Sequence, residues 1–337
     1  MKIGKVSENC LKRSVLRQLN TERKEVLCGA GIGEDCAIFS FSRGENVVTC
    51  MQEAAVAISP ETLAESVGEP VMNLPQLIQK CANNLAAKGS EPFAVEIALI
   101  LPECLVEPEL RAMMVDAREK CRELSLEMAG GQTRTSKAVS MPVAVVTGYG
   151  KLSAQDAKPA KPGQDVVISK WIGLQGTALV AKRNRELLVS RYPAYFVDEA
   201  AGFDRYLSVI PEAATAMKSG VCAMHDASEG GIFATLWELA EGAGVGLIID
   251  LKKLPLRQET VEVCELCNVN PYELLSGGCL VMTAEDGQAL VDALEAEGIP
   301  ATIVGRVTDS KDRILVNEDE IRYMDKPKQD EIYREVK

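Results

Sequence analysis

Residues 29–39 read GAGIGEDCAIF and combine a glycine-rich loop, two adjacent carboxylates and the start of an apolar strand. Such a loop leaves backbone N–H groups free to face an anion, and Glu34 and Asp35 follow it directly. Carboxylates beside a phosphate suit Mg²⁺, which prefers oxygen ligands. The Gly-Lys-Ser/Thr ending of a P-loop is missing, and no helix opens here as in a dinucleotide-binding motif. The stretch therefore predicts either a nucleotide-phosphate loop or a plain glycine turn.

Two further stretches look like places where α/β proteins bind ligands. In CMQEAAV, residues 50–56, Glu53 comes at the end of a predicted strand. In EMAGGQTRTS, residues 127–136, two glycines are followed by Gln132 and Thr133, which predicts a second tight turn. Strand ends and glycine turns commonly carry binding residues, so both stretches favour the phosphate interpretation.

The stretch AMHDASEGGIF contains His225, the only histidine of the chain. We expect a strand that ends at His225 and a helix that starts with Asp226 as its N-cap, with Glu229 completing a capping box. The glycines from Gly230 onward and the free N–H groups of the first turn make this helix start a candidate anion site. No nucleophile elbow is present. A structural or substrate-side role and a general acid–base role both stay open for His225.

The 337 residues alternate predicted strands and helices in both halves, which indicates an α/β or α+β protein with two domains. Residues 151–164 are rich in Pro, Lys and Ala and have no apolar period, so we place the domain boundary there. The predicted domains cover residues 1–150 and 165–337.

Composition narrows the classes of function. Lys and Arg total 37 against 49 Asp and Glu, a net charge of −12, so we expect no nucleic-acid binding. No apolar run approaches the roughly 20 residues of a membrane span, and no secretion signal is visible, which favours a cytoplasmic protein. The 11 cysteines are then expected to be reduced thiols. The one CxxC pair, Cys264 and Cys267, is expected to be two small residues on a helix face, because a zinc site needs two more ligands.

The motifs GIGEDCAIF, CANNLAAKG, GGQT and AMHDASEGG occur in the order typical of the aminoimidazole ribonucleotide (AIR) synthetase superfamily. The chain resembles this superfamily over nearly its whole length, and two stretches, MKIGKVSENCLKRSVL and LSVIPEAATAMKSGVCAMHDASEGG, are most similar to its hydrogenase-maturation (HypE-like) branch. The resemblance implies a PurM-like fold. Its N-terminal domain would form a homodimer through a β-barrel and hold ATP, and its C-terminal α/β domain would close over the substrate.

The resemblance also implies a reaction and a site. Family enzymes use ATP and Mg²⁺ to phosphorylate a carbonyl, amide or related oxygen of a small molecule, because such an oxygen leaves poorly until it is phosphorylated. Glu34, Asp35 and Glu53 would hold Mg²⁺, and the catalytic set would be Asp35, Glu53 and His225. The nucleotide-binding set would be Gly31, Gly33, Glu34, Asn83, Asn84, Gly130, Gly131, Gln132, Thr133, Asp226, Ser228, Glu229 and Gly230.

Several positions depart from the family pattern. Asn84 stands where an Asp is expected, Gln132 replaces an acid or histidine, and Leu174 and Gln175 replace an Asp-His pair. Amides bind Mg²⁺ more weakly than carboxylates, so we expect one ion and not two. The dehydratase branch also ends in a reactive cysteine, whereas the last cysteine here is Cys279, so we do not expect that tail chemistry.

Three interpretations therefore stay open. The protein is an ATP-using enzyme with an unidentified substrate, a non-catalytic relative that binds a nucleotide, another small anion or a partner protein, or a purely structural dimer.

Overall fold

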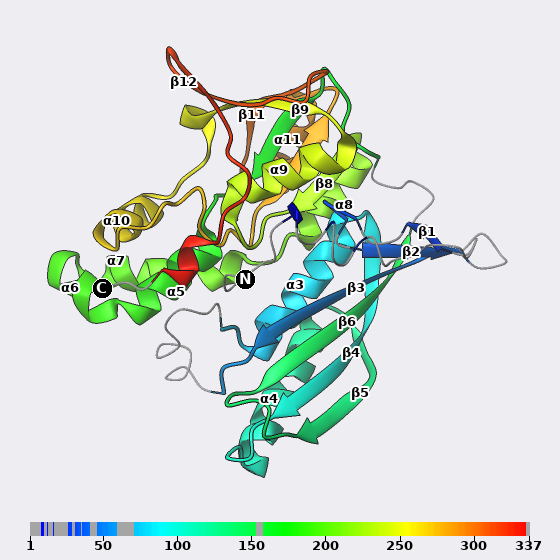
Figure 1. The fold of residues 1–337 in the computed structure, drawn as a ribbon, viewed down its shortest axis with the longest axis vertical. Helices are drawn as coiled ribbons and strands as arrows, with labels where there is room; N and C mark the ends of the chain where they lie inside the picture. The colour runs from blue at the N-terminus through cyan, green and yellow to red at the C-terminus, as the bar shows by residue number, and fades with distance from the viewer. Residues whose placement is uncertain are drawn as a thin grey trace.

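The computed structural model describes residues 8, 9, 12, 16, 26–28, 31–34, 36–40, 46–58, 71–152 and 158–334. Within these residues the strands form two separate sheets, one in each half of the chain (Figure 1). Helix α3 (Leu74–Ala87) packs on the N-terminal sheet and also contacts α8 (Ile210–Lys218) and β8 (Val221–Asp226) of the C-terminal half. This helix therefore joins the two halves.

The N-terminal sheet has the strand order β1-β2-β3-β6-β4-β5. Its strands are β1 (Val26–Cys28), β2 (Cys36–Ser40), β3 (Asn46–Ala55), β4 (Ser90–Leu101), β5 (Glu127–Thr135) and β6 (Val143–Leu152). All neighbours are antiparallel except β4 and β5, which are parallel and are connected through α4 (Glu107–Glu123). Parallel pairing requires such a crossover connection.

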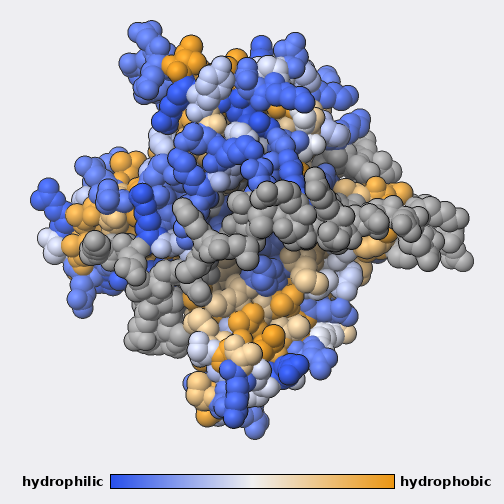
Figure 2. Space-filling view, in the orientation of Figure 1, coloured by the Kyte–Doolittle hydropathy of each residue, from blue (hydrophilic) through white to orange (hydrophobic). Residues whose placement is uncertain are grey.

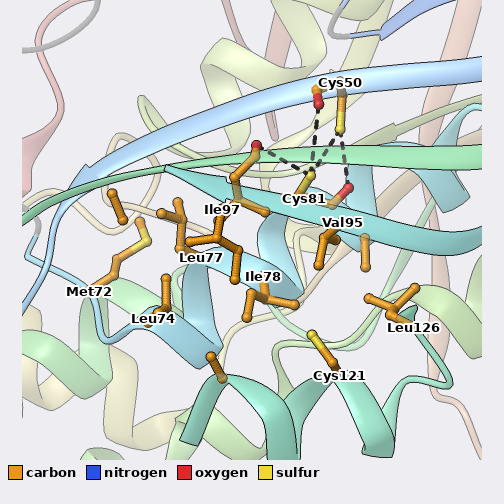
Figure 3. Packing of buried hydrophobic residues seen from close by; sticks show 14 of the residues in the cluster. Cys50, Met72, Leu74, Leu77, Ile78, Cys81, Val95, Ile97, Cys121 and Leu126 are labelled. Carbon is orange, nitrogen blue, oxygen red and sulfur yellow. Dashed lines mark hydrogen bonds between the residues drawn. The ribbon is translucent and has the colours of Figure 1, made fainter. Parts of the chain in front are cut away.

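Helices α3 and α4 cover one face of this sheet. Leu77, Ile78 and Cys81 of α3 pack against Val95 and Ile97 of β4 (Figure 3). Helix α3 starts with a capping box, in which Asn73 Oδ1 accepts from Gln76 N at 2.8 Å and Gln76 Oε1 accepts from Asn73 N at 3.1 Å. The opposite face of the sheet is not covered by any described element, and Met51 on that face is 60% exposed.

The C-terminal sheet has the strand order β13-β12-β9-β11-β7-β10-β8. Its other strands are β7 (Asp165–Ser169), β9 (Gly246–Asp250), β10 (Leu280–Ala284), β11 (Ala301–Thr308), β12 (Arg313–Asn317) and β13 (Glu320–Tyr323). Helix α9 (Gly231–Ala243) packs on one face, while α8 and α11 (Gly287–Ala296) pack on the other. Only β12 and β9 pair in parallel.

A third apolar cluster lies beside this sheet. It is formed by α5 (Leu174–Arg183), α6 (Arg185–Arg191), α7 (Ala194–Ala201) and α10 (Gln258–Leu266). Ala57 and Val71 from the N-terminal half and Ile332 from the tail are buried in it, so it also ties the halves together. Short 3₁₀ helices lie at η2 (Phe203–Tyr206), η3 (Leu251–Lys253) and η4 (Glu331–Tyr333).

The predicted tight turn at residues 130–133 is wrong, because these residues lie inside strand β5. Gly130 and Gly131 pair with Glu96 and Ile97 of β4, next to an irregularity in the register. Gly131 has φ 149°, and a Cβ there would overlap the carbonyl oxygen of Ile97. Glycine at residue 131 therefore allows the backbones of β5 and β4 to approach closely.

No helix among the residues described here is long and apolar enough to span a bilayer. The predicted mixed α/β architecture is confirmed by the two sheets and the helices that cover them. Dimerisation through a barrel stays a prediction.

Candidate functional site

The glycine turn at residues 31–34 lies against the C-terminal half. Gly31 and Glu34 form an isolated bridge, and Gly33 has φ 74°. A Cβ on Gly33 would overlap the carbonyl oxygen of Glu238 and would lie 3.4 Å from the Cα of Gly242, both in α9. Residue 33 is therefore glycine both for its left-handed backbone and for its contact with a helix backbone.

The Glu34 carboxylate already has a cation. Lys88 Nζ, just after the end of α3, lies 2.5 Å from Glu34 Oε2, and the Cys28 thiol donates to the same oxygen at 3.5 Å. Burial opposes the charged form of Lys88, but the hydrogen bond and charge of Glu34 outweigh it and raise the pKa of Lys88. Burial, followed by the charge of Glu34, raises the pKa of Cys28. Asp35 lies outside the described residues.

Glu53 points away from this turn. It is exposed on the open face of the N-terminal sheet, in one cross-strand row with Val145, Ala98 and Gln132. Three strand spacings separate Glu53 from Gln132, about 14 Å. One chain therefore does not bring these two predicted site residues to a common ion.

The side chain that does face α3 from strand β3 is Gln52. With the Asn84 amide oriented by its neighbours, Gln52 Nε2 donates to Asn84 Oδ1 at 2.9 Å. The Asn84 nitrogen donates to Asp226 Oδ2 at 2.8 Å, to Asp226 Oδ1 at 3.1 Å and to the Lys80 carbonyl at 3.1 Å. Asn84 and Asp226, two predicted site residues, thus meet directly across the two halves.

Asn83 makes a second contact between the halves. Its Nδ2 donates to the Leu207 carbonyl at 2.7 Å, and its Oδ1 accepts from Val209 N at 3.0 Å and from Gln79 Nε2 at 2.8 Å. Asn83 is buried, so its amide satisfies backbone groups that would otherwise lack partners. The paired asparagines of α3 therefore act here as contacts between the domains.

His225 lies on the other side of strand β8. Its Nε2 lies 3.3 Å from Glu238 Oε2 of α9, and its side chain is buried under that helix. Glu238 was not among the residues singled out from sequence. The pair makes a half-buried polar contact. This contact lies next to the turn at residues 31–34, because Gly33 packs on the backbone of the same glutamate.

The predicted N-cap at Asp226 is wrong, since α9 begins at Gly231 with Gly230 as its cap residue. Gly230 N donates to Asp330 Oδ2 at 2.5 Å, while Leu275 N and Ile332 N donate to Oδ1 at 3.2 and 2.8 Å. Burial raises the pKa of Asp330 to about 7. The predicted anion site at this helix start thus holds a carboxylate from the chain itself.

Ser228 and Glu229 lie in the same turn before α9. The Ser228 carbonyl accepts from Ser276 N at 3.1 Å and from Gly231 N at 3.2 Å, which fixes the turn on the loop before β10. The charge of Glu229 adds to the raised pKa of Asp330. Both residues therefore lie beside the hydrogen bonds that Asp330 accepts from Gly230, Leu275 and Ile332.

A small cavity lies where α5 meets the start of α3. It is lined by Gln76 of α3 and by Gln175 and Lys182 of α5. Leu275, which also donates to Asp330, closes one side. Its volume of about 10 Å³ leaves room for about one water molecule. In this conformation the cavity is too small for a nucleotide.

The residues described do not fit a Mg²⁺ site within one chain. No group of three His, Cys, Asp or Glu side chains with metal-ligand geometry occurs among them. Glu34 is paired with Lys88, and Glu53 lies on the open face. Cys264 and Cys267 are buried in the third cluster, and burial raises their thiol pKa values to about 12 and about 11. These two residues are packing residues, as predicted.

Family models match both halves of the chain. The model for the N-terminal domain of AIR synthase related proteins matches residues 33–152, and the model for their C-terminal domain matches residues 161–317. The chain belongs to the AIR synthase related family. The resemblance inferred from the motifs is therefore confirmed.

Similar proteins include two curated members and one solved structure. Carbamoyl dehydratase HypE of Cupriavidus necator is 26% identical over 82% of this chain and 77% of its own. Carbamoyl dehydratase HypE of Rhodobacter capsulatus is 28% identical over 66% of each. The crystal structure of hydrogenase maturation protein HypE in complex with ATP has a TM-score of 0.70 and 16% identity, and the match covers 98% of this chain and 97% of that one. This likeness shows the fold, so the predicted two-domain PurM-like fold is confirmed, while the exact domain bounds stay predictions.

Proposed function

We propose that this protein binds ATP and works in hydrogenase maturation, phosphorylating a carbonyl, amide or related oxygen of a small substrate. The observation that carries the proposal is the family match over both halves, together with the similarity to carbamoyl dehydratases over most of the chain. An ATP complex exists for a HypE of the same fold. No mechanistic step through Mg²⁺ is derived, because the described residues of one chain do not assemble a site for it.

We place the phosphates of ATP at the turn of residues 31–34. Its backbone lies beside Lys88, a half-buried cation that now pairs with Glu34. A phosphate group at this turn would compete with Glu34 for Lys88, because a buried ammonium favours the nearest anion of higher charge. In this proposal Asp35 supplies a carboxylate at the same turn, and His225 with Glu238 lines the side formed by α9.

The geometry of one chain leaves this site incomplete. Residues 130–133 lie on β5, at the opposite edge of the N-terminal sheet from β1 and β2 next to the turn. In this proposal a second copy brings them near the turn. We therefore propose a homodimer in which the β5 of one protomer completes the ATP site of its partner.

The open face of the N-terminal sheet supports this homodimer. Met51 and Phe93 are 60% and 38% exposed, and Val143, Val145 and Ile100 on the same face are only half-buried. Figure 2 shows orange and pale residues gathered over these strands in the lower part of the molecule. Exposed apolar side chains on a sheet face are unfavourable in a monomer and are normally covered. The same holds for the edge strand β5, which pairs with no further strand among the described residues.

Calorimetric titration tests the proposal. Wild-type protein should release or take up heat on ATP addition with a saturable binding curve, and Asp35→Ala should weaken binding at least about tenfold, or 1.4 kcal/mol. Glu103→Ala, an exposed change remote from the turn, is the matched control and should bind as wild type. Absence of ATP binding by a folded wild-type protein, with and without Mg²⁺, would end the proposal. A cytoplasmic location and a partner protein stay predictions.

A further inference from the structure

The contact between Asn84 and Asp226 joins the two domains at a buried carboxylate. Asn84 belongs to α3 in the N-terminal half, and Asp226 is the last residue of β8 in the C-terminal half. Asp226 is 5% exposed. A buried carboxylate is costly unless hydrogen-bond donors or a cation satisfy it, so whatever lies beside Asp226 helps to decide how the domains stay together.

Here an amide provides the donors. The Asn84 nitrogen is within hydrogen-bonding distance of both Asp226 oxygens and of the Lys80 carbonyl. Gln52 donates to the Asn84 oxygen, which fixes the amide so that its nitrogen side faces Asp226. The residues therefore form a chain from Gln52 to Asn84 to Asp226 in which each amide has one defined orientation.

A carboxylate in place of the Asn84 amide would change the chemistry of this contact. An Asp at residue 84 would bring two carboxylates within about 3 Å of each other. Two such groups are both ionised only if a cation lies between them; without a cation, one of them keeps its proton. Oxygen ligands at this spacing are those that Mg²⁺ and Ca²⁺ prefer.

We propose that Asn84, oriented by Gln52, replaces a divalent cation at Asp226, so that this contact between the domains is independent of metal. The inference does not rest on the proposed ATP binding, because it concerns the protein without nucleotide. It also accounts for the Asn at residue 84, where the family resemblance implies an Asp.

Thermal unfolding with EDTA or with millimolar Mg²⁺ or Ca²⁺ tests this inference. Wild-type Tm should be the same in all three conditions within about 1 °C. Asn84→Asp should lower the Tm in EDTA by about 5 °C or more, and Mg²⁺ or Ca²⁺ should recover most of that loss. Asn83→Asp removes the donor to the Leu207 carbonyl but keeps an oxygen that can accept from Val209 N. No carboxylate faces residue 83 in the described contacts, so the cations should not recover its loss.

A swapped double variant keeps the test decisive if Asn84→Asp does not fold. Asn84→Asp combined with Asp226→Asn restores one amide and one carboxylate with their places exchanged. We expect its Tm in EDTA to lie closer to wild type than that of either single variant, which is a double-mutant cycle across the contact. The inference is overturned if the swapped variant is no better than the single variants. It is also overturned if Mg²⁺ without nucleotide raises the wild-type Tm by several degrees and Asp226→Asn abolishes that rise.

Discussion

His225 and Asp226 are adjacent in the chain, yet their side chains leave strand β8 on opposite faces. His225 contacts Glu238 of α9 within the C-terminal domain, and Asp226 contacts Asn84 of α3 in the N-terminal domain. Successive side chains of a strand alternate between its faces, so the two residues cannot act as a His-Asp pair. Asp226 instead serves the contact between domains.

Replacing Gly33 by Ala should destabilise the protein strongly. The new Cβ would overlap the Glu238 carbonyl and force a left-handed backbone on a residue with a side chain. We expect the free energy of unfolding in urea to fall by about 2–4 kcal/mol. Gly163→Ala is the matched control, because Gly163 has φ 89° but nothing within 4 Å of its added Cβ, so it should lose only about 1 kcal/mol. Equal losses in the two variants would contradict the packing of this turn on α9.

Removing the Asn83 amide should weaken the contact between the domains. Asn83→Ala leaves the Leu207 carbonyl, the Val209 amide and Gln79 Nε2 without their side-chain partner in a buried place. We expect a loss of about 2–4 kcal/mol in unfolding free energy, from these three unsatisfied groups. Asn184→Ala, which removes one half-buried hydrogen bond to Val180 at the end of α5, should cost about 1 kcal/mol or less. A loss at residue 83 no larger than at residue 184 would count against the domain contact.

Asp330 should make stability depend on pH. Burial, opposed by the hydrogen bonds from Ile332 and Gly230, raises its folded-state pKa to about 7 against 3.8 in the unfolded chain. The folded state therefore binds more protons between about pH 4 and pH 7, and the contribution of Asp330 to stability is full below pH 4 and falls as pH rises to 7. The difference in unfolding free energy between wild type and Asp330→Asn should change by up to about 4 kcal/mol over this range. A difference that is flat from pH 4 to pH 8 would refute the raised pKa.

Gly148 should tolerate no side chain because Cys81 Sγ and Leu85 Cδ1 fill the space beside it. Cys50 Sγ and Cys81 Sγ lie 3.3 Å apart (Figure 3), and a Cβ on Gly148 would lie 2.6 Å from Cys81 Sγ. We expect Gly148→Ala to lower the unfolding free energy by about 1–3 kcal/mol. Adding Cys81→Ala should recover part of this loss, because it removes the sulfur that the new methyl group meets. A double variant whose loss is simply the sum of the two single losses would show that the overlap with Cys81 Sγ does not carry the cost.

Local patterns predicted the elements well where the chain determines its own structure. The strand before α9, predicted to end at His225 and observed to end at Asp226, follows from apolar periodicity and glycine positions, as do the following helix and the mixed α/β order. The orientation of β3 did not follow from the sequence, because Cys50 and Met51 are adjacent apolar residues on opposite faces of the strand. Only the burial of Cys50 shows that Gln52 lies on the helix side and Glu53 on the open side.

Contacts between distant segments could not be predicted in this way. The local sequence around Asp226 fits a capping box. Its carboxylate instead accepts hydrogen bonds from Asn84, which is more than a hundred residues away in sequence. The predicted anion site at the start of α9 likewise binds the Asp330 carboxylate near the C-terminal end. Glu34 forms an ion pair with Lys88. Each of these contacts depends on how distant segments of the chain pack against each other. Local patterns in a single sequence do not reveal that packing.

We propose that two protomers together complete an ATP site at the turn of residues 31–34. Met51→Asp places a charge on the open face of the N-terminal sheet, where it should prevent dimer formation without entering the core. Sedimentation equilibrium combined with ATP titration measures both effects on one sample. We predict that wild type is a dimer that binds ATP, and that folded Met51→Asp is a monomer with at least about tenfold weaker ATP binding. A monomeric variant that binds ATP as tightly as wild type, or a monomeric wild type that binds ATP, would contradict the claim.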